Sequence, residues 1–167
     1  HPDKVRRLAL LGNPGNMMGG KPPLAIRIIA APPFTKLAMH FMIPKNKESA
    51  LKTLTIMGHS REFASTLPGE LADAYFNFDH LPHFVISLSS LIKNMIPEIK
   101  KEELIHLQKP TALILGTNDN FLSQEKGKKI VSAMPNGTFY SITNSGHLPW
   151  LEDPQQIAKI ILNFFKN

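Results

Sequence analysis

Apolar residues gather in short runs near the two ends of the chain, and turn residues close each run. The first run extends from Val5 to Leu11 and stops at Gly12-Asn13-Pro14-Gly15. The second, Thr111 to Leu115, stops at Gly116, and a third with high β-propensity covers Thr138 to Ile142. Short runs of this kind are typical of buried strands in a parallel sheet. The sequence therefore predicts three such strands.

Helical signals follow each of the last two strands. Ser123 is placed to cap a helix that lies between them. Asp153 is placed to cap a final helix, with Pro154 at its first position and Gln156 where it would complete a capping box. The order strand, helix, strand, helix over residues 109–167 is typical of a parallel α/β sheet.

The middle of the chain holds most of the prolines and shows no strand alternation. Short apolar patterns at helical spacing lie between these prolines, near residues 24–29, 34–42, 68–78 and 84–95. Helices joined by proline turns between two core strands predict an inserted cap. We therefore expect an α/β protein in three parts: a core strand within 1–15, a helical cap over 16–107 and a C-terminal core over 108–167.

The composition is that of a folded protein. Of the 167 residues, 43% are hydrophobic, which argues against disorder. No stretch approaches the roughly 20 apolar residues needed to span a bilayer, so we expect no membrane segment. Cysteine is absent, which excludes a disulfide framework and thiolate zinc sites. A chain without disulfides is compatible with a reducing compartment, and we expect a cytoplasmic protein.

The charge of the chain is basic but dispersed. Its 19 Lys and Arg residues against 13 Asp and Glu residues give a formal net charge of +6. The lysines occur singly or in pairs such as Lys100–Lys101, with no basic run of five and no interleaved aromatic residues. A nucleic-acid site would gather such residues on one face. We therefore expect a solvated basic surface and no nucleic-acid partner.

Two residues that could form part of a catalytic relay follow neighbouring predicted strands. Asp119 lies in the loop after the second strand, and His147 lies in the loop after the third. Ligands of open parallel sheets bind beyond the carboxyl ends of the strands, where these loops lie. A histidine can take a proton from a nucleophile while a carboxylate holds its tautomer. By spacing alone, an aspartate that forms a turn and a structural histidine are the simpler explanation of the two residues.

The residues around this pair resemble the C-terminal end of the α/β-hydrolase superfamily. In that family a strand led by Pro-Thr ends in Gly-x-x-Asp, as does Lys-Pro-Thr-Ala-Leu-Ile-Leu-Gly-Thr-Asn-Asp over 109–119. A Gly-His loop then precedes a helix that starts with Glu-x-Pro, as in Gly-His-Leu-Pro-Trp-Leu-Glu-Asp-Pro over 146–154. Residues 1–15 are similar to the family's strand after the nucleophile-bearing helix, and a helical cap is common after that strand.

This resemblance implies a partial α/β-hydrolase fold, with parallel strands flanked by helices and an inserted, mainly helical cap. It assigns Asp119 as the acid and His147 as the base of a serine hydrolase, most simply a carboxylesterase acting on a small or medium apolar ester. The reaction subclass stays open among esterase, lipase, peroxidase, carbon–carbon hydrolase, epoxide hydrolase and dehalogenase. Since the sequence has no phosphate loop or dinucleotide fingerprint, we expect no cofactor.

The nucleophile of the family stands on a sharp turn written Gly-x-Ser-x-Gly, and family order puts this turn before His1. We therefore expect the chain to be a C-terminal portion that is inactive by itself. One substitute is Ser60 in Gly58-His59-Ser60-Arg61-Glu62, which keeps the family order of the three residues. However, Glu62 would crowd the turn, and residues 51–57 before it form only a mediocre strand. We expect Ser60 to belong to a loop or helix cap of the cap region.

Two further interpretations follow from the sequence. His80 and His83 flank Pro82, which breaks helical spacing, and no carboxylate pair completes a metal site, so we expect no metal.

The alternative to an enzyme is a non-catalytic hydrolase-like module used for binding or association. An incomplete parallel sheet would leave a bare edge, through which copies of the chain could associate.

Overall fold

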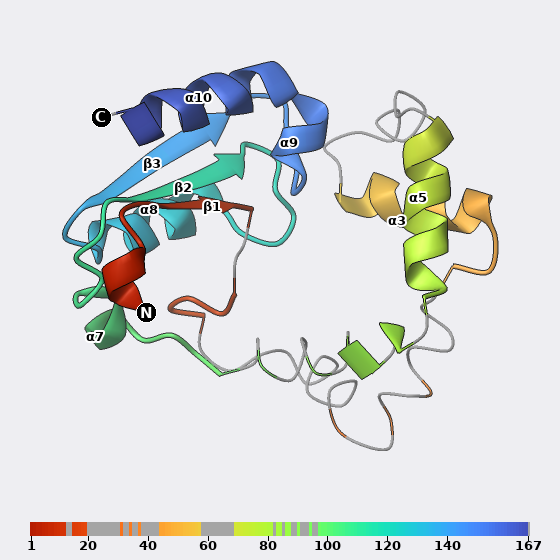
Figure 1. Ribbon diagram of the computed structural model, residues 1–167, viewed down its shortest axis with the longest axis horizontal. Helices are drawn as coiled ribbons and strands as arrows, with labels where there is room; N and C mark the ends of the chain where they lie inside the picture. Colours follow the sequence, from red (N-terminus) through yellow and green to blue (C-terminus); the bar gives the residue numbers. More distant parts are fainter. Residues whose placement is uncertain are drawn as a thin grey trace.

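The computed structural model describes residues 1–12, 15–19, 44–57, 69–81 and 97–166, with residues 31, 34, 37, 83, 84, 86, 87, 90 and 94 between these ranges. A three-stranded parallel sheet with helices packed against it lies on the left in Figure 1. Its strands are β1 (Leu8–Leu11), β2 (Thr111–Gly116) and β3 (Gly137–Ile142), in the order β1-β2-β3. In the register of the sheet, Leu8 is paired with Thr111, and Thr111 is paired with Gly137. All three predicted strands are confirmed.

Helices cover both faces of this sheet (Figure 1). Helix α8 (Gln124–Ser132) packs on one face, and α10 (Pro154–Lys166) packs on the other. Strand β2 is buried along its whole length because its side chains alternate between the two layers. Leu113 and Leu115 pack toward α8, whereas Ala112 and Ile114 pack toward α10. The continuous apolar run that predicted this strand therefore reflects burial on two faces.

Both predicted helix caps are present. The Ser123 side chain accepts a hydrogen bond from the Lys126 backbone at 3.2 Å, and Asp153 accepts one from the Gln156 backbone at 3.0 Å. The backbone N–H of Asp153 donates to the Pro149 carbonyl rather than to Gln156, because a short helix ends there. This helix, α9 (Pro149–Glu152), occupies part of the segment that the sequence predicted as a loop.

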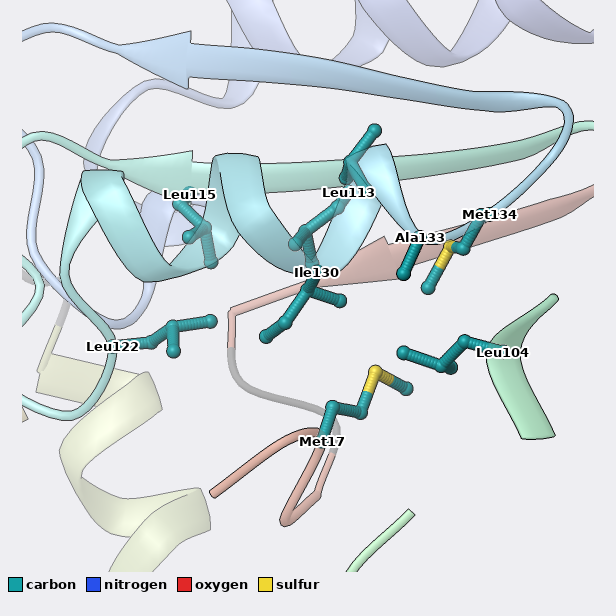
Figure 2. Close-up of a cluster of buried hydrophobic side chains, with 9 residues drawn as sticks. Met17, Leu104, Leu113, Leu115, Leu122, Ile130, Ala133 and Met134 are labelled. Carbon is teal, nitrogen blue, oxygen red and sulfur yellow. The ribbon is translucent and has the colours of Figure 1, made fainter. Parts of the chain in front are cut away.

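The segments that follow β1 and precede β2 lie side by side. Met17 forms a parallel bridge with Ile99, and the two strand-like segments exchange backbone hydrogen bonds of 2.9 and 3.0 Å. Figure 2 shows Met17 and Leu104 meeting side chains of β2 and α8 in one apolar cluster. Leu104 belongs to α7 (Lys101–Leu104), which the sequence did not predict. The chain therefore leaves the core and returns to it through adjacent segments.

Between these segments of the sequence, the described residues include two longer helices. They are α3 (Lys47–Met57) and α5 (Gly69–Asp79), and an ion pair between Lys47 and Asp73 joins them. The prediction of a helix after residue 68 is confirmed, but the interpretation of residues 51–57 as a weak strand is wrong. The backbone N–H of Asn46 donates to the Ser49 hydroxyl, and that of Ser49 donates to the Asn46 side chain. These bonds cap α3 and favour a helix over residues 51–57. None of the described helices is long and apolar enough to cross a membrane. A short 3₁₀ helix, Pro2–Lys4, precedes β1.

Gly116, the last residue of β2, lies against the backbone that follows β3. A Cβ atom at Gly116 would overlap the carbonyl oxygens of Ser145 and Gly146. Any other residue would push these two segments apart, so the glycine permits a close approach of backbone to backbone.

We expect Gly116→Ala to lower the free energy of unfolding by about 2–3 kcal/mol, since the added methyl group meets backbone rather than a flexible side chain. Gly69→Ala is the matched control, because nothing lies within 4 Å of its new methyl group. Urea unfolding, monitored by circular dichroism, measures the free energy of unfolding of both variants. Equal stability of the two variants would contradict the close approach.

Candidate active site

The loops after β2 and β3 meet at the carboxyl edge of the sheet. The backbone N–H of Asn118 donates to the Ser145 carbonyl at 2.8 Å, and that of Asn144 donates to the Thr117 hydroxyl at 3.0 Å. Asn144 has a φ of 54°, a left-handed conformation that asparagine tolerates. These bonds connect the loop that carries Asp119 to the loop that carries His147.

Asp119 is held by its own loop and faces His147. One carboxylate oxygen, Oδ1, accepts hydrogen bonds from the backbone N–H groups of Phe121 (2.7 Å) and Leu122 (3.1 Å). The other, Oδ2, lies 3.0 Å from Nδ1 of His147. The Asp119 side chain is fully buried, at 0% exposure, and that of His147 is 20% exposed. The structure therefore brings the two predicted residues together, with the carboxylate inside and the imidazole toward solvent.

The pKa of Asp119 lies below its ordinary value. Burial by itself raises this pKa, but the hydrogen bond from His147 and those from the Phe121 and Leu122 backbone outweigh it. The carboxylate is thus ionised at neutral pH and must accept a proton from Nδ1 of His147. The tautomer with hydrogen on Nδ1 leaves Nε2 free to take a proton from a reacting group.

Two residues that the sequence did not single out confine the imidazole. The Phe121 ring centroid lies 4.4 Å from that of His147, with the ring planes inclined at 47°. Gly12, at the end of β1, has a φ of 70°, and a Cβ there would come within 3.3 Å of the His147 ring. The signal in the sequence is the turn that ends the first apolar run, because it is one of three loops at the carboxyl ends of the predicted strands, where ligands bind.

The remaining candidates from the sequence are Ser60 and the histidines His80 and His83. Residues 47–57 form α3, so no strand leads into Ser60 as a nucleophile turn requires; Ser60 itself lies outside the described residues. Nδ1 of His80 lies 2.7 Å from the Phe76 carbonyl, within its own helical segment. Across the part of the chain that the structure describes, no group of three or more His, Asp or Glu residues could hold a metal ion.

Comparisons with known proteins agree with the fold. No protein-family model matches the chain. It is 28% identical to the uncharacterized hydrolase YugF of Bacillus subtilis over 121 residues, 72% of this chain and 43% of that protein. It is 27% identical to 2-hydroxy-6-oxononadienedioate/2-hydroxy-6-oxononatrienedioate hydrolase 2 of Pseudomonas putida over 89 residues, 53% of this chain and 30% of that protein. MGS-M2, an α/β hydrolase from a deep-sea metagenome library, superposes with a TM-score of 0.73 at 15% identity over 100% of this chain and 58% of its own.

The chain is similar in sequence to curated hydrolases and has a partial form of the α/β-hydrolase fold, a parallel three-stranded sheet flanked by helices. The family resemblance and the fold expected from the sequence are thereby confirmed. The chain matches less than half the length of the two curated relatives and about three fifths of the solved structure.

We expect Asp119→Asn to remove a pH-dependent contribution to stability. Because the folded-state pKa is depressed, the ionised carboxylate stabilises the fold at pH values above the ordinary pKa of about 3.9. This contribution is lost as the pH falls through the folded-state pKa. Asparagine keeps the acceptor for the Phe121 and Leu122 N–H groups, so the variant removes the charge together with the acceptor that faces His147.

The measurement is urea unfolding of both proteins between pH 2 and pH 7. The difference in unfolding free energy should be largest above about pH 5 and should shrink as the solution is acidified below about pH 4. A difference that stays constant over this range would contradict the ionised Asp119–His147 pair.

Proposed function

We propose that this chain supplies the acid and base of a serine hydrolase site in a protein that cleaves small or medium apolar esters. The observation that supports the proposal is the 3.0 Å contact between Nδ1 of His147 and a buried carboxylate of lowered pKa. The superfamily of the chain supports hydrolysis as the reaction type. A cytoplasmic location, suggested by the absence of cysteine, belongs to the same proposal.

In the proposed reaction, Nε2 of His147 takes the proton of a nucleophilic hydroxyl as that oxygen attacks the ester carbonyl. Asp119 holds the tautomer and stabilises the imidazolium that forms. His147 then gives the proton to the leaving alcohol oxygen, which yields an acyl-enzyme. In the second half, His147 deprotonates a water molecule that attacks the acyl group, and the proton returns to the nucleophile as the acid is released.

The nucleophile of this reaction is proposed to come from residues outside the chain. The sequence contains no Gly-x-Ser-x-Gly, and its nearest approximation, at Ser60, has Glu62 in place of the last glycine. The helix that precedes Ser60 also differs from the strand that a nucleophile turn needs. The acid–base pair alone would then have no oxygen to activate for acyl transfer.

We expect the chain by itself not to turn over p-nitrophenyl esters, whereas a longer form that includes a Gly-x-Ser-x-Gly segment should do so. In that longer form, His147→Ala should lower kcat by at least about 10⁴-fold, since the base acts as a unit with the nucleophile. His106→Ala is the control, because His106 is exposed outside the site. Ester turnover by the chain alone that disappears in Ser60→Ala would overturn the proposal.

A second function, association through the sheet, is supported by the outer edge of β1. Within the described residues no strand pairs with this edge, although all four strand residues are apolar and half-buried. The backbone N–H of Leu8 donates to the Pro110 carbonyl, and that of Gly12 donates to the Ile114 carbonyl. Because successive backbone N–H groups of a strand point to opposite sides, the N–H of Ala9 points away from β2, to the open edge. An unpaired apolar edge of this kind accepts a strand from another chain or from another part of the same protein.

If copies associate through this edge, light scattering after size exclusion should show a mass above 18.6 kDa that rises with concentration. Ala9→Pro should reduce this association, because proline removes the outward N–H and leaves the ladder with β2 intact. A monomer at every concentration would exclude the association function. Association unchanged by Ala9→Pro would place it elsewhere on the surface.

A further inference from the structure

The loop that carries His147 is closed on itself by a carboxylate at its far end. Oε2 of Glu152, the last residue of α9, accepts a hydrogen bond from the Ser145 hydroxyl at 2.9 Å. The same oxygen accepts a second bond from the backbone N–H of Gly146 at 2.6 Å. Gly146 is the residue directly before His147, so the carboxylate holds the backbone from which the imidazole projects.

The contacts of Glu152 are sheltered from water. Ser145 is fully buried and Gly146 is buried, while Glu152 is half-buried. Hydrogen bonds to an ionised acceptor are roughly twice as strong as those between neutral groups, and partial burial limits competition by solvent. A hydroxyl and an N–H buried here without an acceptor would be costly, which favours the closed loop.

The closed loop is also pressed against the loop that carries Asp119. The carbonyls of Ser145 and Gly146 abut Gly116, at the end of β2. The Ser145 carbonyl accepts a bond of 2.8 Å from the N–H of Asn118, the residue before Asp119. Glu152 thus fixes Ser145, whose other contacts fix the start of the Asp119 loop. A displacement of this segment would alter the 3.0 Å separation of His147 and Asp119.

We propose that Glu152 is a positioning residue, which holds the backbone of Ser145 and Gly146 so that Nδ1 of His147 faces Oδ2 of Asp119. Glu152 acts through these two residues and does not itself touch reacting atoms. Its importance for catalysis rests on the proposed function of the Asp119–His147 pair, whereas its effect on the geometry of the pair can be measured without turnover.

Asp153 offers a matched control. It is the next residue along the chain, and its carboxylate also accepts a backbone N–H bond, from Gln156 at 3.0 Å. That bond caps α10 rather than the His147 loop. Loss of either carboxylate should lower stability, but only loss of Glu152 should alter the imidazole.

The experiment is proton and nitrogen NMR of the full chain, with the imidazole nitrogens labelled, to observe the hydrogen-bonded Nδ1 proton of His147 and its exchange with water. In Glu152→Ala we expect this proton to exchange at least about tenfold faster or its resonance to be lost, because two charge-assisted bonds that oppose loop opening are gone. Ser145→Ala, which removes one of the two bonds, should have an intermediate effect. Glu152→Gln, whose amide oxygen can still accept, should retain the resonance, and Asp153→Ala should leave it unchanged.

An unchanged resonance and exchange rate in Glu152→Ala would overturn the assignment of Glu152, as would an equal change in Asp153→Ala. If Glu152→Ala does not fold, Ser145→Ala decides, and an unaltered Nδ1 proton in that variant overturns the assignment. Asp119→Ala separates this inference from the proposed function. If the Nδ1 resonance of His147 is still observed in Asp119→Ala, Asp119 and His147 do not form the pair and the proposed function fails. If the resonance is lost in Asp119→Ala but unchanged in Glu152→Ala, the pair stands and only the positioning role of Glu152 fails.

Discussion

The candidate site depends on how closely the backbone after β3 approaches the end of β2. Neighbouring parallel strands end at the same edge of a sheet, and here the segment 145–146 lies directly against Gly116. This approach brings the loops of Asp119 and His147 within hydrogen-bond distance. A side chain at position 116 would separate them. The geometry of the pair is therefore a consequence of strand order together with one position where the Cβ is missing.

Electrostatics then determines that Asp119 accepts, and Nδ1 of His147 donates, the hydrogen bond of the pair. Burial works against an ionised carboxylate at Asp119, and three hydrogen-bond donors offset it. The hydrogen bond from His147 lowers the pKa of Asp119 most, and the other two donors are backbone N–H groups of the loop that carries Asp119. The imidazole of His147 supplies the third donor and remains partly open to solvent. A buried acceptor beneath a more exposed base is the arrangement that proton transfer at Nε2 requires.

Much of this could be predicted from local patterns. Burial on two faces makes a strand apolar along its length, which identified β2, and side-chain caps such as Ser123 mark helix starts in the sequence itself. The prediction of a weak strand over residues 51–57 failed. The hydrogen bonds between Asn46 and Ser49 cap a helix there, and the hydrophobic pattern of these few residues does not distinguish a strand from a helix. The short helices α7 and α9 were missed because four residues are too few to show a helical period.

The sequence by itself determined which two residues are the candidates for an acid–base pair, since Asp119 and His147 each follow a recognisable strand and stand in motifs that resemble those of the α/β-hydrolase superfamily. Only the tertiary structure decided what surrounds them. Phe121 and Gly12 against the imidazole, and Glu152 closing the loop on Ser145 and Gly146, are contacts between groups whose separation and direction depend on strand register and on the path of α9. Motifs record residue types along one chain, whereas hydrogen-bond distances depend on how separate segments pack together.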